Sequence, residues 1–281
     1  MGVEAGKPSG AAPSRMSVPP FRLSAMSLSV RTRDLVRASI QRMGLDVRRV
    51  GRGPRRTLAE VVQNARRAGF EAGGVIDVGV ARGTPGLYDA WPEARLLLVD
   101  PLVEWEGHLR EFAAGRGSYI IAAAGTKDGP AEMRVHRVPE LSSLVGERDE
   151  CQTTLRLVEV VTIDAVAAEL PGPLVVKVDV EGGELDVLGG AATTLSRTEL
   201  VLVETSMFEL IPGQPLTHDV VAFMAERGFA IYDIFGGHLR PLDGALAQVD
   251  LAFARVDGVL RRDRRYATPD QADALYRSWG R

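Results

Sequence analysis

The chain has 281 residues, of which 45% are hydrophobic, 25% charged and 6% aromatic, as in an ordinary globular protein. This length allows one large domain or two small ones. A single cysteine, Cys151, excludes a disulfide scaffold and a thiolate-rich metal site. No apolar run reaches the ~20 residues that cross a bilayer, and the net charge of −3 excludes a strongly basic nucleic-acid binder.

The net charge hides a division along the chain. Residues 1–56 contain 12 Lys and Arg against three acids, a charge of +9, whereas the rest contains 22 against 34, a charge of −12. We therefore expect a basic, partly disordered N-terminal arm (1–56), a main domain (57–257) and a helical C-terminal tail (258–281). Residues 31–43 have the apolar spacing of a helix.

The N-terminal arm has two interpretations. A disordered extension explains its Ala-, Gly-, Ser- and Pro-rich start, and an organelle transit peptide explains its Arg- and Ser-rich, acid-poor composition. The helix at 31–43 packs on the main domain or touches an anionic surface. No continuous apolar segment follows a basic start, so we expect no secretory signal and a cytoplasmic protein.

The main domain alternates predicted strands and helices. In chain order we expect a helix at 57–69 with Thr57 as N-cap, a strand at 75–79, a short helix at 84–90, a strand at 95–100, a helix at 102–114, strands at 118–124, 131–138, 155–163 and 174–180, a helix at 184–195, a strand at 199–205, a helix at 216–227, and strands at 229–235 and 248–256. Apolar strands separated by helices predict an α/β fold with a doubly wound, mostly parallel sheet. The last two strands predict an antiparallel edge pair, and ligands should bind at the carboxyl ends of the strands.

The first predicted strand ends in Asp77-Val-Gly79-Val-Ala-Arg82-Gly83-Thr84. Glycines in a strand-to-helix turn let backbone N–H groups approach a ligand, and the next helix start favours a carboxylate or phosphate. The spacing is G-x-x-x-G, so the G-x-G-x-x-G dinucleotide fingerprint is absent. A tight structural turn is the alternative interpretation.

Asp100 directly follows the second apolar strand, RLLLV. An acid at this position can accept both hydroxyls of an adenosine ribose through charge-assisted hydrogen bonds. A helix N-cap before Pro101 explains the same residue. Its occurrence after the glycine turn favours the ligand-binding interpretation.

The segment Lys177-Val-Asp179-Val-Glu181-Gly-Gly-Glu184 places charges on a strand of valines. Strand alternation predicts that Lys177, Asp179 and Glu181 share one face. Acids at the ligand-binding edge of a sheet commonly act as bases or metal ligands. A structural ion pair, with acids at a helix start, is the alternative. Glu204 ends the next strand and should lie near Asp179.

Five segments in this order resemble the FkbM-type methyltransferases: VIDVGVARGT, LLLVDP, LVVKVDVEGGELDVLGGA, ELVLVETSMFELIPGQPL and QVDLAFARV. The resemblance spans roughly residues 57–257, and KVDVEGGELDVLGGA is its most specific part. It implies a class I, Rossmann-like fold with a seven-stranded sheet whose last pair is antiparallel. It also implies transfer of a methyl group from S-adenosylmethionine to a hydroxyl of a natural product, sugar or lipid.

The resemblance also implies roles for single residues. The cofactor-binding residues would be Asp77, Gly79, Arg82, Gly83, Thr84, Asp100 and Ala123. Asp179 would be the base, followed by Glu181 and Glu204, with Lys177 holding Asp179 ionised. A divalent metal, if one is used, would bind Asp179, Glu181 and Glu204.

The sequence departs from the family pattern in the first turn. Val80-Ala81-Arg82 replaces small residues and an Asn, and Asp100 replaces a frequent Glu. Arg82 would meet the cofactor carboxylate or an anionic acceptor. Three alternatives stay open: a nucleotide-binding oxidoreductase, a non-catalytic binding protein of the same fold, and a nucleic-acid methyltransferase. The acidic main domain argues against the last, so we expect a small-molecule acceptor with a hydroxyl and no nucleic acid.

Overall fold

The computed structural model describes residues 57–146 and 152–279. The expected N-terminal arm and its helix at 31–43 lie outside these residues. Within the described part of the chain, no helix is both long enough and apolar enough to cross a membrane.

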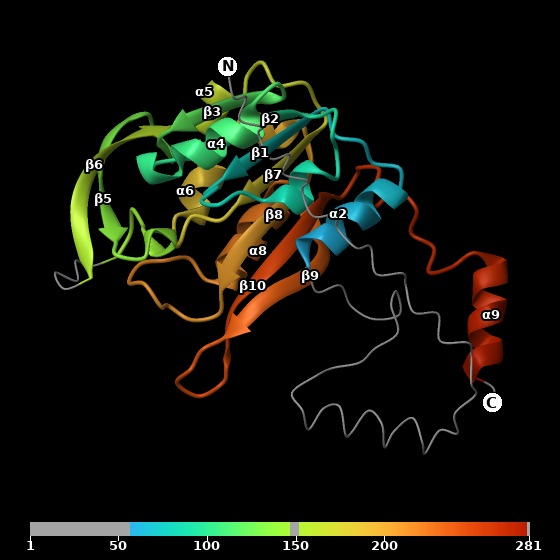
Figure 1. The fold of residues 1–281 in the computed structure, drawn as a ribbon. Helices are drawn as coiled ribbons and strands as arrows, with labels where there is room; N and C mark the ends of the chain where they lie inside the picture. Colours follow the sequence, from blue (N-terminus) through green and yellow to red (C-terminus); the bar gives the residue numbers. More distant parts are fainter. Residues whose placement is uncertain (1–56, 147–151, 280–281) are drawn as a thin grey trace, which may run out of the picture. The chain divides into compact units, whose positions relative to one another are not determined.

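Seven strands form the main sheet in the order β3-β2-β1-β7-β8-β10-β9 (Figure 1). They are β1 (Gly74–Val78), β2 (Arg95–Asp100), β3 (Gly117–Ile121), β7 (Leu174–Val178), β8 (Thr198–Ser206), β9 (Phe229–Leu239) and β10 (Leu246–Arg255). The first five pair in parallel, whereas β10 is antiparallel to both β8 and β9. The predicted doubly wound sheet with an antiparallel edge pair is confirmed.

Helices cover both faces of this sheet, as continuous apolar strands require. One face, which we call the α3 face, carries α2 (Leu58–Arg67), α3 (Pro85–Tyr88) and α4 (Glu106–Ala113), the last directly after the 3₁₀ turn η1 (Val103–Trp105). The other face carries α5 (Ile163–Val166), α6 (Glu184–Gly189), α7 (Ala192–Ser196) and α8 (Thr217–Glu226).

Strand alternation decides which face each side chain meets. On β1, Val75 packs in the core of the α3 face, whereas Ile76 and Val78 pack in the opposite core. Asp77 therefore points to the α3 face, although it lies in a strand that is buried along its whole length. A fully buried carboxylate needs partners, and the elements on this face must supply them.

The α2 helix begins as its sequence predicts. The hydroxyl of Thr57 accepts a hydrogen bond from the backbone N–H of Glu60 at 3.2 Å, which satisfies one of the unpaired donors of the first turn. Val61, Val62 and Ala65 are buried against the sheet. The C-terminal part of the chain contains one further helix, α9 (Pro269–Trp279).

Two predicted elements are divided in the structure. The strand expected at 118–124 splits into β3 and β4 (Ala123–Ala124), and β4 leaves the main sheet to join β6 (Thr153–Val161) and β5 (Gly129–His136) in a second, three-stranded sheet. Figure 1 shows β5 and β6 as a curved hairpin. The helix expected at 184–195 breaks near Gly190, where a Cβ atom would lie 2.0 Å from the carbonyl oxygen of Gly125.

Candidate active site

A cavity of about 270 Å³ opens at the carboxyl edge of the main sheet. Its walls come from the turn after β1, the end of β2 with η1, the β4 strand, the segment after β5, the turn after β7, and β8. Six of the predicted site residues line it: Gly79, Asp100, Ala123, Asp179, Glu181 and Glu204. The other five, Asp77, Arg82, Gly83, Thr84 and Lys177, do not.

Gly79 is required because the ends of β1 and β7 approach each other closely. Its φ is +76°, and an added Cβ atom would lie 1.7 Å from the carbonyl oxygen of Asp179. The backbone N–H of Gly79 donates to the carbonyl of Val99 at 3.0 Å, which ties the turn to β2. The turn therefore holds the ends of three strands together at the cavity wall.

Gly83 and Thr84 serve the start of α3 rather than the cavity. Gly83 has a φ of +89°, and an added Cβ atom would lie 2.1 Å from the ring of Phe112 on α4. Thr84 is the N-cap residue of α3, with Pro85 at the first helical position. Both residues thus have structural roles, and the cofactor contact that the resemblance implies for them stays a prediction.

Arg82 also differs from expectation. Its Nε donates to Oε1 of Glu140 at 2.9 Å, and its guanidinium lies over the ring of Trp105, 5.4 Å from the centroid. Glu140 and Trp105 both line the cavity, but Arg82 does not. The positive charge is thus already paired with an acid at the rim of the cavity.

Asp100 lies at the end of β2 with both carboxylate oxygens in use. Oδ2 accepts the backbone N–H of Ala81 and Oδ1 accepts that of Leu102, each at 2.9 Å. Burial raises the pKa of Asp100, and hydrogen bonds from the backbone of Ala81, Leu102 and Val80 oppose the rise. A carboxylate has about four acceptor positions, so the backbone does not use all of them. Asp100 therefore fixes the local turn and still offers acceptors to the cavity.

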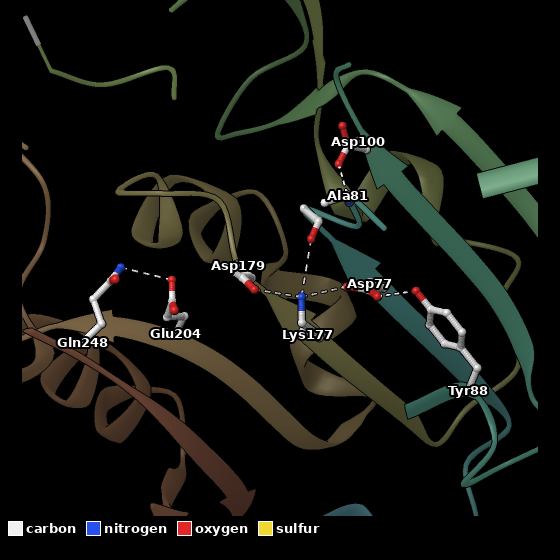
Figure 2. A network of polar contacts seen from close by, with 9 residues as sticks. Asp77, Ala81, Tyr88, Asp100, Lys177, Asp179, Glu204 and Gln248 are labelled. Atoms are coloured by element: carbon white, nitrogen blue, oxygen red, sulfur yellow. Dashed lines mark hydrogen bonds and ion pairs between the residues drawn. The ribbon is translucent and has the colours of Figure 1, made fainter. Parts of the chain in front are cut away.

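Asp77 belongs to a buried network rather than to the cavity wall (Figure 2). It is fully buried, and the Tyr88 hydroxyl donates to its Oδ2 at 2.5 Å. Its Oδ1 has no directed hydrogen bond but faces the Lys177 ammonium at 3.2 Å. Asp77 does not line the cavity but pairs with Lys177, which in turn contacts Asp179 on the cavity wall. The role of Asp77 in the cofactor site stays a prediction.

Lys177 connects this interior network to the cavity. It is the register partner of Asp77 on the neighbouring strand, so both side chains point to the α3 face. Its ammonium lies 3.2 Å from Asp179 Oδ2 and 3.4 Å from the Gly79 carbonyl (Figure 2). Burial alone would lower the pKa of Lys177, but the carboxylates of Asp77 and Asp179 raise it. Lys177 is therefore a permanent cation beside Asp179.

Asp179 and Glu181 lie beyond the end of β7, which stops at Val178. Strand alternation therefore does not place them. Glu181 has a φ of +54°, and its carbonyl accepts the Ser143 hydroxyl at 2.6 Å. Glu181 and Ala81 are the non-glycine residues with positive φ in the described chain, and both line the cavity. Such strained backbone gathers at functional sites.

The carboxylates of Asp179, Glu181 and Glu204 converge on one side of the cavity, with ligand atoms within 4.8 Å of one another. Burial and the charge of Asp179 raise the pKa of Glu181 to about 7. The same causes, with Glu181 and Asp250 added, raise the pKa of Glu204 to about 9. The raised pKa favours the protonated form of Glu204 at neutral pH, and Gln248 Nε2 donates a hydrogen bond to its Oε2 at 3.1 Å.

Five side chains at or behind the cavity were not predicted: Tyr88, Trp105, Ser143, Gln248 and Asp250. The sequence does contain a signal for two of them. On β10, Val249, Leu251 and Phe253 pack in the core opposite the α3 face, so Gln248 and Asp250 must point to the α3 face. Asp250 is the register partner of Glu204, and burial beside Asp179 raises its pKa to about 6.

These raised pKa values predict that the folded protein loses stability as the pH rises. A carboxyl whose pKa is raised by folding stabilises the folded state below its unfolded pKa and loses this contribution as the pH passes its folded pKa. For Glu204 this window extends from about 4.5 to about 9. We expect the melting temperature to fall between pH 5 and pH 9, and Glu204→Gln to raise it by about 2–4 °C at pH 9.

Thermal unfolding followed by circular dichroism measures this effect. Glu204→Gln should change little near pH 5, where the wild-type side chain is already protonated in the folded state. Glu93→Gln, at an exposed acid before β2, is the matched control and should not alter the pH dependence. An equal effect of Glu204→Gln at both pH values would contradict the assignment.

The architecture and the site together define a class of protein. A mostly parallel sheet with an antiparallel last pair and a ligand cavity at its carboxyl edge is the Rossmann-like fold of class I methyltransferases. The methyltransferase FkbM domain matches residues 77–231, more than half of the chain. The chain therefore belongs to the FkbM methyltransferase family. No curated protein matches it.

Solved structures with a similar fold are distant in sequence. A methyltransferase FkbM from Methylobacillus flagellatus is 17% identical over 64% of this chain and 43% of its own, with a TM-score of 0.39. This chain therefore spans less than half of that protein.

Two further structures have the same TM-score of 0.39. Magnesium protoporphyrin IX methyltransferase from Synechocystis PCC 6803, with bound S-adenosylmethionine, is 14% identical over 83% of this chain and 100% of its own. An rRNA methylase from Streptococcus thermophilus is 8% identical over 70% and 93%.

Proposed function

We propose that the protein transfers a methyl group from S-adenosylmethionine to a hydroxyl of a small molecule, sugar or lipid. One observation carries this proposal. A single cavity is bordered by a buried acid with free acceptor positions, Asp100, and by an acid paired with a lysine, Asp179. Asp100 suits the binding of a ribose, and Asp179 suits the removal of a proton. Both tasks belong to a methyltransferase, and the chain belongs to a methyltransferase family.

The residues present fit the cofactor. The carboxylate of Asp100 can accept hydrogen bonds from the vicinal hydroxyls of a ribose. Val99, Leu102, Ala123 and Met133 give the adjoining wall an apolar character suited to a purine. The turn after β1 lines the cavity with its backbone and with the small side chain of Ala81. It therefore leaves room for the amino-acid part of S-adenosylmethionine.

S-adenosylmethionine supplies a methyl group made electrophilic by its sulfonium. The protein must then align the acceptor hydroxyl and remove its proton. We assign the proton to a carboxylate oxygen of Asp179, because Lys177 balances its charge at 3.2 Å. Glu204 is protonated at neutral pH, so it serves as a hydrogen-bond donor rather than as the base. Glu181, with a pKa of about 7, is the second candidate for the base.

The charge of this side of the cavity limits the acceptor. Asp179, Glu181 and Asp250 face a single lysine, whose charge Asp77 shares, and Glu204 adds no charge while it is protonated. An anionic acceptor such as a nucleic-acid phosphate would be repelled there. We therefore propose a neutral or cationic acceptor, and we favour a small molecule over nucleic acid. The alternative of an oxidoreductase has no support from the family match.

Repulsion among these acids can be reduced in two ways. Some of the carboxylates can be protonated, or a divalent cation can bind among them. Asp179, Glu181 and Glu204 would hold it, because oxygen ligands suit Mg²⁺ and Ca²⁺. Chelation distinguishes the two: a cation-dependent enzyme loses activity with EDTA and regains it with Mg²⁺, whereas the protonated cluster is indifferent to both.

The proposed reaction is tested with methyl-labelled S-adenosylmethionine and a metabolite extract, with and without chelator. We expect label in a product that releases it only under ether-cleaving conditions. Label in nucleic acid would favour the nucleic-acid alternative. Binding of the cofactor without transfer to any acceptor would favour a non-catalytic binding protein.

Asp100→Ala should weaken cofactor binding by about 10²–10⁴-fold, because two hydrogen bonds to a charged acceptor are each worth about 1.5–3 kcal/mol. Isothermal titration calorimetry with S-adenosylmethionine measures the change. Asp89→Ala, at an exposed acid after α3, is the control and should bind like the wild type. Since Asp100 also holds the N–H groups of Ala81 and Leu102, Asp100→Asn is the milder companion variant. An unchanged affinity in both Asp100 variants would remove this residue from the cofactor site.

A further inference from the structure

We propose that the ion pair between Arg82 and Glu140 forms a strap across the mouth of the cavity and controls how fast the cofactor enters and leaves. Arg82 lies in the turn after β1, and Glu140 lies 58 residues further along, in the 3₁₀ turn η2 (Pro139–Leu141). The inference rests on the proposed function, because it takes S-adenosylmethionine as the ligand of the cavity.

The two partners belong to different walls of the cavity. Ala81, next to Arg82, lines one wall, and Pro139 and Glu140 line another. The Arg82 side chain is 74% exposed and that of Glu140 is 35% exposed. A pair this exposed cannot lie at the floor of the cavity. It therefore joins the two walls at the solvent side, where a ligand has to pass.

Trp105 lies beneath this strap. The Arg82 guanidinium is 5.4 Å from the centroid of the indole, and Trp105 itself is buried and lines the cavity. The cation–π contact with Trp105 on η1 and the ion pair with Glu140 on η2 thus hold the Arg82 guanidinium between these two turns. Three segments that are distant in the sequence meet at Arg82, and all of them border the cavity.

The strap is strong enough to delay passage and weak enough to open. Nε and Oε1 are 2.9 Å apart, and exposed ion pairs contribute little to stability. Arg82 does not line the cavity, so breaking the pair from its side, by Arg82→Gln, should leave the affinity nearly unchanged. The pair must open before a ligand passes in either direction, so its loss should accelerate binding and release by the same factor.

Stopped-flow tryptophan fluorescence on mixing the whole protein with S-adenosylmethionine tests this. We expect Glu140→Gln and Arg82→Gln each to raise both the association and dissociation rates roughly two- to five-fold. The double variant should match the single ones, because both remove the same interaction. The dissociation constant of Arg82→Gln from calorimetry should change less than about two-fold. Raising the salt concentration should accelerate exchange in the wild type but not in Glu140→Gln.

Glu104→Gln provides a matched control. Glu104 on η1 forms a two-bond pair with Arg156 on β6, at 2.7 and 2.8 Å, and neither residue lines the cavity. Its removal should leave the exchange rates unchanged.

The possible failures are distinguishable. Rates that are the same in the wild type and in the strap variants overturn the strap, as do equal accelerations in Glu104→Gln. Fluorescence that does not change although calorimetry detects binding also overturns it, because Trp105 then does not border the bound cofactor. A wild type that binds no S-adenosylmethionine refutes the proposed function, and the strap with it.

Discussion

Asp179→Asn should lower turnover by about 10²–10⁴-fold, the usual loss when a general base is removed, while cofactor binding is retained. Asparagine has the size of aspartate but cannot take up the proton of the acceptor hydroxyl. Asp179 lines the same cavity as Asp100, and its carboxylate lies 3.2 Å from the largely buried Lys177 ammonium. The effect should therefore appear in kcat rather than in the affinity for S-adenosylmethionine.

Initial rates of label transfer, together with calorimetry of cofactor binding, measure this result. Asp186→Asn is the matched control: Asp186 is an exposed acid on α6, which follows the same segment, and its replacement should leave the rate unchanged. Melting temperatures of both variants show whether the fold is intact. Unchanged turnover in Asp179→Asn would transfer the role of base to Glu181.

Lys177→Met should lower the free energy of unfolding by about 3–5 kcal/mol, because it leaves the buried Asp77 without its cation. Asp77 is fully buried and the Lys177 side chain is only 12% exposed, so water cannot replace the ammonium. At about 2–4 °C per kcal/mol for a domain of this size, the melting temperature should fall by roughly 10 °C. Chemical denaturation with urea measures the loss directly.

Lys127→Met is the control, because Lys127 is an exposed lysine after β4. It should change the unfolding free energy by less than ~0.5 kcal/mol. The double variant Asp77→Asn/Lys177→Met should regain part of the loss, since it removes the unpaired charge. If Lys177→Met lowers the free energy of unfolding by less than ~1 kcal/mol, the ion pair between Lys177 and Asp77 does not stabilise the cavity wall as proposed.

The fold was predictable because its strands carry an unambiguous pattern. Runs such as RLLLVD at 95–100 are apolar throughout, which requires cover on both faces, and β2 has these bounds in the structure. The break after β3 was not predictable, because Ala122, Ala123 and Ala124 fit either a strand end or a bend. It depends on the pairing of β4 with β6, a contact between segments distant in the sequence.

The site was predictable where an acid lies at or near the carboxyl end of a strand. Asp100 ends β2, Asp179 directly follows β7, and Glu204 lies near the end of β8; all three line the cavity. Asp77 lies one residue before the end of β1, but its side chain contacts Lys177 and Tyr88 and does not line the cavity. Which of these acids line the cavity therefore depends on contacts between strands, not on position along one strand.

The remaining residues depend on tertiary contacts that no local pattern contains. In the sequence, Tyr88 is one of the apolar residues of a short helix. Only the structure shows that its hydroxyl donates a hydrogen bond to Asp77. Arg82 is a free cation in the sequence, but Glu140 on a distant segment pairs with it. Glu181 has a left-handed backbone conformation, and its carbonyl accepts a hydrogen bond from Ser143. From the sequence alone, this conformation would be expected at the glycines that follow Glu181.

We propose that one cavity holds the nucleoside at Asp100 and presents the reacting group to Asp179. A crystal structure of the protein with S-adenosylhomocysteine tests it most directly. We predict ribose hydroxyls within hydrogen-bond distance of Asp100 and the sulfur on the side of Asp179, Glu181 and Glu204. A nucleoside bound elsewhere, or a sulfur that points away from Asp179, would contradict the account.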